Sequence, residues 1–255
     1  MQLQPAHRPV NTLRDRVAYN LVQLMRYVFD KVRSAQRHAA LRTAGAARLP
    51  CVRAPLARAH LWCHRCHVTQ GTGYGSDLPM TEARWLQRII FLETVAALPG
   101  MVGGAVRHLH SLRLMKRDSG WIHTLLEEAE NERMHLLTFI QLRQPGLLFR
   151  GAVLLTQGLV FNGLFAAYLL SPKTCHRFVG YLEEEAVKTY TRAIADLDAG
   201  LLPAWKNMAA PPLAMEYWKL RSDATMRDLL LAVRADEAVR GISQRCVPSA
   251  LPTAF

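Results

Sequence analysis

One acidic stretch decides the fold of this chain: LLEEAENERMHL, from Leu125 to Leu136. Glu132 and His135 stand three residues apart in it. On an α-helix that spacing puts a carboxylate and an imidazole on one face, so both side chains can reach a single metal ion. A lone Glu-x-x-His is also common on solvated helix faces. The prediction of a metal site therefore depends on whether other stretches supply matching ligands.

Length and charge narrow the class of protein. The chain has 255 residues, 50% of them hydrophobic, which is enough for one substantial core and excludes a disordered chain. Its formal charge of +12 is concentrated before Trp85, and no stretch combines basic residues with interleaved aromatic ones as nucleic-acid-binding motifs do. Nucleic acid is therefore not an expected partner, whereas an anionic membrane surface would suit the charge.

The region before residue 80 differs in character from the rest. No acidic residue occurs from Lys31 to Ser76, and we expect residues 33–80 to be a basic, irregular insertion. Cys63 and Cys66 form a C-x-x-C motif there, but no second ligand pair follows to complete a zinc site. The five cysteines are too few and too irregular for a disulfide framework, so a reducing compartment is expected. The first residues form neither a secretory signal nor a full transit peptide.

Hydrophobic periodicity predicts further helices on both sides of the acidic stretch. We expect them over residues 11–32, 81–102, 147–170, 175–199 and 222–240. Asn11 or Thr12 should cap the first of these helices, and Ser222 the last. Pro99 should kink or break the second helix, because proline lacks the N–H that a helix interior needs.

The longest apolar run, Leu147–Leu170, has Arg150 as its only full charge and is long enough to span a bilayer. Gln157, Asn162 and three glycines dilute it. A spanning helix would also have to return the chain so that the acidic helices on its two sides still meet. We therefore favour a helix that lies against or partly in the membrane.

Three more helices carry a glutamate that can face inward: Glu93, Glu183 and Glu237. Together with the Glu132–His135 pair they predict a four-helix bundle that holds two metal ions between its helices. Carboxylates with a few imidazoles suit iron or manganese. Within the run of three glutamates, Glu184 is expected to face water.

Four stretches resemble the signature motifs of the alternative oxidase family. They are LETVAALPGMVGG at Leu92, NERMHL at Asn131, LEEEAVKTY at Leu182 and RADEA at Arg234. The resemblance covers Thr81 to Ala238 and resumes upstream from His7 to Asp30. The plastid terminal oxidase is a related type, but NERMHL favours the mitochondrial one.

The resemblance implies an all-α, ferritin-like four-helix bundle with a diiron site and membrane-interfacial helices. Such a protein is monotopic on the matrix face of the mitochondrial inner membrane and typically a homodimer. It oxidises ubiquinol and reduces O2 to water in respiratory electron transport, without pumping protons. We divide the chain accordingly into an N-terminal helix of the oxidase domain (1–32), the insertion (33–80), the diiron domain (81–240) and an irregular tail (241–255).

The resemblance also implies residue roles. The iron ligands would be Glu93, Glu132, His135, Glu183 and Glu237, and Tyr190 would be the redox-active tyrosine. Residues that support these ligands would be Asn131, Asp236, Trp218 and Glu185. The quinol pocket would be lined by Arg26, Asp30, Arg88, Leu92, Ala186 and Thr189, with the two arginines able to polarise a quinone oxygen. From spacing alone, Arg26 and Asp30 are equally consistent with an exposed helical ion pair.

Two features depart from the family pattern. The stretch between Asp30 and Thr81 has no expected counterpart, and Arg240 stands where a second histidine ligand is expected. Because Gly241 favours a helix stop, we expect the helix to end there and Arg240 to turn away from the site. The chain would then bind iron incompletely and have impaired activity. A catalytically inactive membrane-associated relic, a plastoquinol oxidase of the plastid type and a soluble ferritin-like carboxylate protein are the alternatives.

Overall fold

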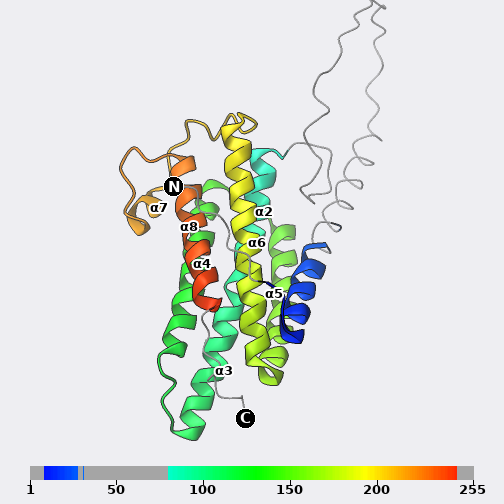
Figure 1. The fold of residues 1–255 in the computed structure, drawn as a ribbon. Coiled ribbons are helices and arrows are strands. Elements are labelled where there is room, and N and C mark those ends of the chain that lie inside the picture. The colour runs from blue at the N-terminus through cyan, green and yellow to red at the C-terminus, as the bar shows by residue number, and fades with distance from the viewer. Residues whose placement is uncertain (1–8, 28–30, 32–79, 246–255) are drawn as a thin grey trace, which may run out of the picture. The chain divides into compact units, whose positions relative to one another are not determined.

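The computed structural model describes residues 9–27, residue 31 and residues 80–245 (Figure 1). Within these ranges the elements are helices joined by turns, with one isolated bridge between Ala209 and Thr225. The predicted all-α fold is confirmed. The chain forms two units, Met1–Val22 with Met80–Phe255 and, separately, Gln23–Pro79. The predicted insertion, residues 33–80, lies outside the described residues except for Met80.

A first helix covers residues 13–27. The Thr12 hydroxyl accepts a hydrogen bond from the Asp15 N–H (3.2 Å), and the Asp15 carboxylate accepts one from the Thr12 N–H (3.0 Å). This reciprocal cap identifies Thr12, not Asn11, as the N-cap. Ala18 and Val22 are buried, while Leu13, Val17 and Leu21 on the other side are exposed. Residues 28–30 and 32 are not described, so the extension of this helix to Val32 stays a prediction.

The next two helices are α2 (Glu82–Ala96) and α3 (Leu98–Leu114). Ala97 separates them, and Pro99 lies in the first turn of α3, where its missing N–H costs nothing. The break predicted at Pro99 is thus confirmed. α4 (Trp121–Leu142) then packs against both α2 and α3.

Glycine brings α3 very close to α4. A Cβ atom added to Gly100 would stand 2.6 Å from the Leu125 carbonyl oxygen and 3.1 Å from the Ala129 amide nitrogen, which are backbone atoms of α4. Only glycine fits such a contact without moving a helix. The acidic face of α4 is thereby held against the bundle.

The remaining helices are α5 (Leu147–Leu170), α6 (Pro172–Asp198), the short α7 (Pro212–Tyr217) and α8 (Met226–Arg245). The N-cap expected at Ser222 is wrong: Thr225 precedes α8, and its N–H and hydroxyl both donate to Asp228 at 2.8 Å. The stop expected at Gly241 is also wrong, because α8 continues to Arg245. A glycine inside a helix costs only about 1 kcal/mol, which packing against α6 can offset.

The main core lies between α2, α4, α6 and α8. It includes Trp85, Phe139, Tyr190, Leu229 and Leu230, all fully or almost fully buried. In Figure 1 these four helices run alongside one another. The core surrounds the acidic residues and so keeps water away from them.

Two helical segments are long and apolar enough to cross a membrane, judged by length and composition only: Glu82–Leu114 and Leu147–Leu170. The first is 67% buried inside the protein over its most apolar part, but the second only 6%. Tyr168 is the one fully buried residue of α5, while leucines such as Leu148, Leu154 and Leu159 are 93%, 73% and 70% exposed. The core therefore accounts for the apolar character of α2 and α3 but not for that of α5.

Candidate metal centre

Four buried side chains from three helices converge in the bundle. Glu93 of α2, Glu132 and His135 of α4, and Glu237 of α8 each offer one ligand atom, and these atoms all lie within 4.8 Å of one another. His135 Nδ1 lies 3.5 Å from a carboxylate oxygen of Glu93, 3.5 Å from one of Glu132 and 3.4 Å from one of Glu237. The structure thus brings together four of the five residues predicted as ligands.

The donor atoms of this set fit a metal ion. Among the described residues, Glu93 Oε2, Glu132 Oε2, His135 Nδ1 and Glu183 Oε2 are buried and make no hydrogen bond of ordinary geometry. Buried polar atoms are normally paired, and buried carboxylates need a cation or a metal. Oxygen donors with one imidazole nitrogen are the ligands that a divalent transition metal such as iron or manganese accepts.

Burial and mutual repulsion raise the pKa values of three carboxylates in and beside this set. Burial raises the pKa of Glu93 to about 7 and that of Glu237 to about 8, and the negative charge of Glu132 adds to both shifts. Burial and the charge of Glu128 raise the pKa of Glu183 well above its ordinary value. These groups would hold protons at neutral pH unless another cation replaced them.

The pKa values of His135 and Glu132 shift in the directions that favour an ion pair between them. Burial alone would lower the pKa of His135, but the Glu132 carboxylate, with Asp236 and Glu237, raises it well above its ordinary value. Burial opposes ionisation of Glu132 as well, yet His135 lowers its pKa. The imidazolium supplies the positive charge that this group of carboxylates demands.

A polar network fixes the orientation of His135. Its Nε2 lies 3.4 Å from Asp236 Oδ2, and that oxygen also accepts hydrogen bonds from Trp218 Nε1 (2.8 Å) and Asn131 Nδ2 (3.2 Å). The Trp218 ring stacks on the imidazole at 5.7 Å, and Asn131 also donates to the Tyr217 hydroxyl at 2.9 Å. The structure therefore brings Asn131, Asp236 and Trp218 around His135.

Tyr190 contacts the other carboxylate oxygen of Glu93. It is 2% exposed, and its hydroxyl donates a short hydrogen bond to Glu93. Burial, followed by the charges of Glu93 and Glu237, raises the Tyr190 pKa well above its ordinary value. The phenol therefore stays protonated and keeps its hydrogen bond to Glu93.

Glu183 and Arg240 lie outside this set of four but interact electrostatically with it. Glu183 on α6 is buried and interacts electrostatically with Glu128, Glu237 and Glu132, yet it is not part of the set of four. Arg240 is half-buried, and its positive charge acts on both Glu132 and Glu183. This does not bear out the expectation that Arg240 turns away from the site.

Two further glutamates, Glu184 and Glu128, are buried, although Glu184 was expected to face water and Glu128 was given no role in the site. Glu184 is 5% exposed, so the prediction that it faces water is wrong: α6 packs against α3, α5 and α8, which leaves few positions open to solvent. Glu128 is buried one turn before Glu132, a spacing that could have indicated its place on the inner face.

Tyr217 was missed because no local pattern links it to Asn131. Glu185 forms an ion pair with Lys188 at 2.7 Å, and its supporting role stays a prediction.

The structure describes only four of the six residues expected to line a quinol pocket within one unit of the chain. Four lie on the bundle: Arg88 and Leu92 on α2, and Ala186 and Thr189 on α6. Arg88 and Thr189 are buried, and the other two are half-buried. Arg26 belongs to the separate unit Gln23–Pro79, and Asp30 lies outside the described residues.

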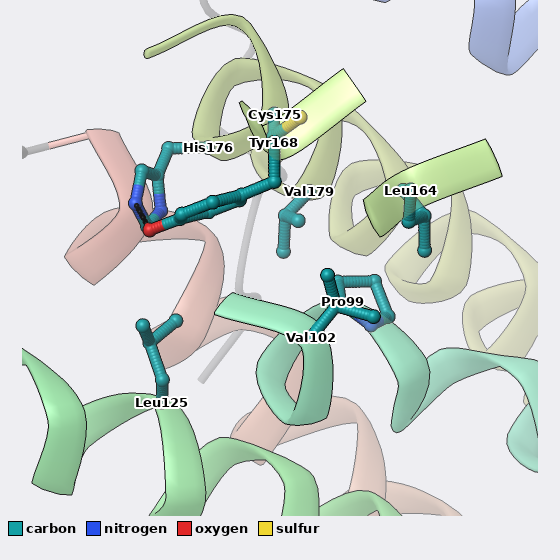
Figure 2. A pocket seen from close by; sticks show the side chains of 8 residues that line it. All are labelled: Pro99, Val102, Leu125, Leu164, Tyr168, Cys175, His176 and Val179. Atoms are coloured by element: carbon teal, nitrogen blue, oxygen red, sulfur yellow. Dashed lines mark hydrogen bonds between the residues drawn. The ribbon is translucent and has the colours of Figure 1, made fainter. Parts of the chain in front are cut away.

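A small apolar pocket lies elsewhere in the bundle (Figure 2). Its lining comes from Pro99, Val102, Leu125, Leu164, Tyr168, Cys175, His176 and Val179. Figure 2 shows the His176 ring facing the Tyr168 hydroxyl, with 3.1 Å between Nε2 and that oxygen. Burial raises the pKa of Cys175 to about 11, so its thiol stays protonated and unreactive at neutral pH. With no carboxylate in its lining, this pocket does not compete as a metal site.

Fold and site define a class: helical-bundle proteins that hold metal between facing helices with glutamates and histidine. The family described as "Alternative oxidase" matches residues 1–244 of this chain. The chain is 65% identical over 177 residues to "Alternative oxidase, mitochondrial" of Emericella nidulans, covering 66% of this chain and 50% of that protein. It is 48% identical over 240 residues to the protein of the same name from Pyricularia oryzae, covering 92% and 57%.

The chain belongs to the alternative oxidase family. The matched range contains residues 33–80 and Arg240, whose departure from the family pattern stays a prediction. The chain spans about half the length of the curated relatives it matches.

Proposed function

We propose that the chain acts as a ubiquinol oxidase, passing electrons from ubiquinol to O2 and giving water without pumping protons. One observation carries the proposal: in a member of this family, Glu93, Glu132, His135 and Glu237 are buried with ligand atoms within 4.8 Å of one another. The quinol gives up its electrons and protons, and O2 takes up both as it is reduced.

Iron would be held by Glu93, Glu132, His135 and Glu237, whose ligand atoms converge, while the predicted role of Glu183 as a further ligand stays a prediction. Bound iron supplies the one-electron chemistry that carboxylates and tyrosine cannot provide alone. Asp236 holds the imidazole in one orientation, which keeps Nδ1 turned toward the carboxylates. The surrounding core excludes water from the site.

Tyr190 would act beside these ligands. Its hydroxyl donates a hydrogen bond to Glu93, so the phenol proton can pass to that carboxylate when the electron goes to bound iron. Its raised pKa excludes a phenolate at neutral pH. Tyr190 would therefore give up an electron and a proton together.

Quinol binding is assigned to the face that α2 and α6 share. Arg88 would donate to a quinone oxygen, and Thr189, beside Tyr190 in the sequence, would lie next to the ring. Leu92 and Ala186 would supply apolar contact. The assignment of Arg26 and Asp30 to this pocket stays a prediction, because Arg26 belongs to the separate unit and Asp30 lies outside the described residues.

The membrane surface is the proposed location, because α5 and the outer side of residues 13–22 expose leucines that the core does not use. The relatives are named mitochondrial, which supports the matrix face of the inner membrane as the place of action. A homodimer is proposed as the assembly. We expect the exposed apolar faces to be covered by lipid and by the second copy.

The deciding experiment measures iron and oxygen uptake together. Chain purified in mild detergent should contain iron and consume O2 with ubiquinol in the presence of cyanide. Protein that is folded but free of iron and inactive would support the relic, an alternative that Arg240 favours. Faster turnover with plastoquinol than with ubiquinol would support the plastid-type enzyme.

A further inference from the structure

One metal position in the acidic core is complete. The ligand atoms of Glu93, Glu132, His135 and Glu237 come from α2, α4 and α8, lie within 4.8 Å of one another and are all buried. Asp236 also holds the far side of the imidazole, as the partner residues of metal-binding histidines commonly do. A single ion placed among these four groups would leave none of them short of a partner.

The other half of the core lacks a nitrogen ligand. Glu183 lies outside the set of four, and one of its buried oxygens has no hydrogen bond. No other histidine of the described residues can serve it. The side chain of His123 is 78% exposed and lies 3.3 Å from Glu127, and His176 is engaged by Tyr168. His108 and His110 lie on the last two turns of α3, away from the sequence positions of the acidic set.

Arg240 is the cation of α8 that can reach this half of the core. It stands three residues after Glu237 on α8, which continues through it, so both side chains leave the helix on nearly the same face. It is half-buried, and its charge acts on Glu183 and Glu132. A guanidinium has no lone pair to give a metal and keeps its charge, so it can serve carboxylates only as a fixed cation.

We infer that this chain holds one metal ion, bound by Glu93, Glu132, His135 and Glu237, and that the Arg240 guanidinium takes the place of a second ion beside Glu183. The inference rests on the metal centre of the proposed function but does not depend on quinol oxidation. In this arrangement the charge of Arg240 both compensates Glu183 and repels a second dication.

The test counts metal ions in the full chain, purified in detergent and stripped of metal. Mn2+ is added in excess, unbound ions are removed, and metal per chain is measured together with the electron paramagnetic resonance spectrum. We expect one ion per chain with the six-line signal of isolated Mn2+. Arg240→His should raise the content to two ions with a spin-coupled spectrum.

Three further variants separate the causes. Arg240→Lys keeps the cation and should stay at one ion. Arg227→His makes the same change at an exposed site on the same helix and should also stay at one. Arg240→Gln removes the cation without adding a ligand, so a second ion should bind, but more weakly than in Arg240→His. Circular dichroism checks that each variant is folded.

Each result bears on a different statement. Two ions in the unmodified chain would overturn the inference about Arg240 and leave the proposed oxidase standing. One ion in Arg240→His and Arg240→Gln alike would show that Arg240 is not what excludes the second ion. Absence of bound metal from every folded variant would remove the metal centre, and the proposed function with it.

Discussion

At the scale of single residues, His135 has a different task at each ring nitrogen. Nδ1 faces three carboxylates at 3.4 to 3.5 Å, and Nε2 faces Asp236 at 3.4 Å. If Nδ1 gives its lone pair to a metal, the proton must stand on Nε2, where Asp236 accepts it. Asp236 therefore selects the tautomer that can bind metal.

We predict that Asp236→Asn lowers metal affinity by about 10- to 100-fold, because an amide can present N–H to Nε2 and favour the wrong tautomer. Metal titration of the stripped protein measures the change. Asp223→Asn is the control, since Asp223 is exposed and forms an ion pair with Arg221. Equal affinity in both variants would deny Asp236 this role.

Glu93→Gln should abolish metal binding and quinol oxidation, because it removes a negative ligand from a buried site and leaves an amide against Tyr190. Iron content and cyanide-resistant O2 uptake check the two effects. Glu130→Gln, an exposed change on α4 where Glu130 pairs with Arg133, should retain both. Turnover in Glu93→Gln would remove this residue from the ligand set.

The metal-free protein should lose stability as pH rises from about 5 to 8. The folded-state pKa of Glu93 is about 7 and that of Glu237 about 8, both above the ordinary 4.5, so folding favours their protonated forms. Their stabilisation is complete below pH 4.5 and is lost as pH passes the raised values; for Glu93 it is on the order of 3 kcal/mol. His135, also raised, acts in the same direction.

Melting temperatures of stripped protein at several pH values measure this effect. Glu237→Gln, which cannot ionise, should flatten the decline, and added metal should reverse it. A melting temperature that rises from pH 5 to 8 without metal would contradict the assigned pKa shifts.

Sequence patterns predicted the residues that converge in the core better than their surroundings. Glu132 and His135 follow from helical spacing, and Glu93 from its place in an apolar run, because both signals are local. The network of Asn131, Tyr217 and Asp236 joins parts of the chain about a hundred positions apart, and only tertiary packing creates it. The burial of Glu184 was missed for the same reason.

At the scale of elements, the contact between α3 and α4 depends on Gly100. We predict that Gly100→Ala destabilises the fold by about 3 kcal/mol, since its Cβ would overlap backbone atoms of α4. Gly158→Ala in α5 is the matched control: nothing lies within 4 Å of its Cβ, and alanine should stabilise that helix by up to about 1 kcal/mol. Thermal unfolding followed by circular dichroism measures both.

Element boundaries show where local signals compete with packing. The α2–α3 break was predictable because Pro99 forbids an interior hydrogen bond whatever surrounds it. The end of α8 was not, because Gly241 only weakens a helix, and packing against α6 decides whether the helix continues. Ser222 and Thr225 are both good caps, and only the position of Asp228 favours Thr225.

At the scale of the whole molecule, the protein has an acidic interior and an apolar outer helix. We predict that it stays with membranes through α5 without crossing them. Replacing Leu154, Leu155 and Leu159 with glutamate should release most of the protein from vesicles of inner-membrane lipids, since exposed charge removes the apolar face. Co-sedimentation measures release, with Leu86→Ala, a change in the core, as the control that should leave binding intact.

Orientation needs a separate measurement. Short tags placed before Leu147 and after Leu170 should both be digested from the same side of sealed membranes. Tags found on opposite sides would mean that α5 spans the bilayer.

The position of the ligands along the chain has a consequence for synthesis. Glu93, Glu132 and Glu237 lie on α2, α4 and α8, and the last of these is the final helix the structure describes. A growing chain carries most of its metal-binding carboxylates long before the helix that closes the site exists. Until α8 docks on α6, we expect those carboxylates to face water and to hold metal weakly, so metal loading should follow the synthesis of α8. Ribosome-bound chains halted before Asp236 should then remain metal-free at metal concentrations that load the finished protein.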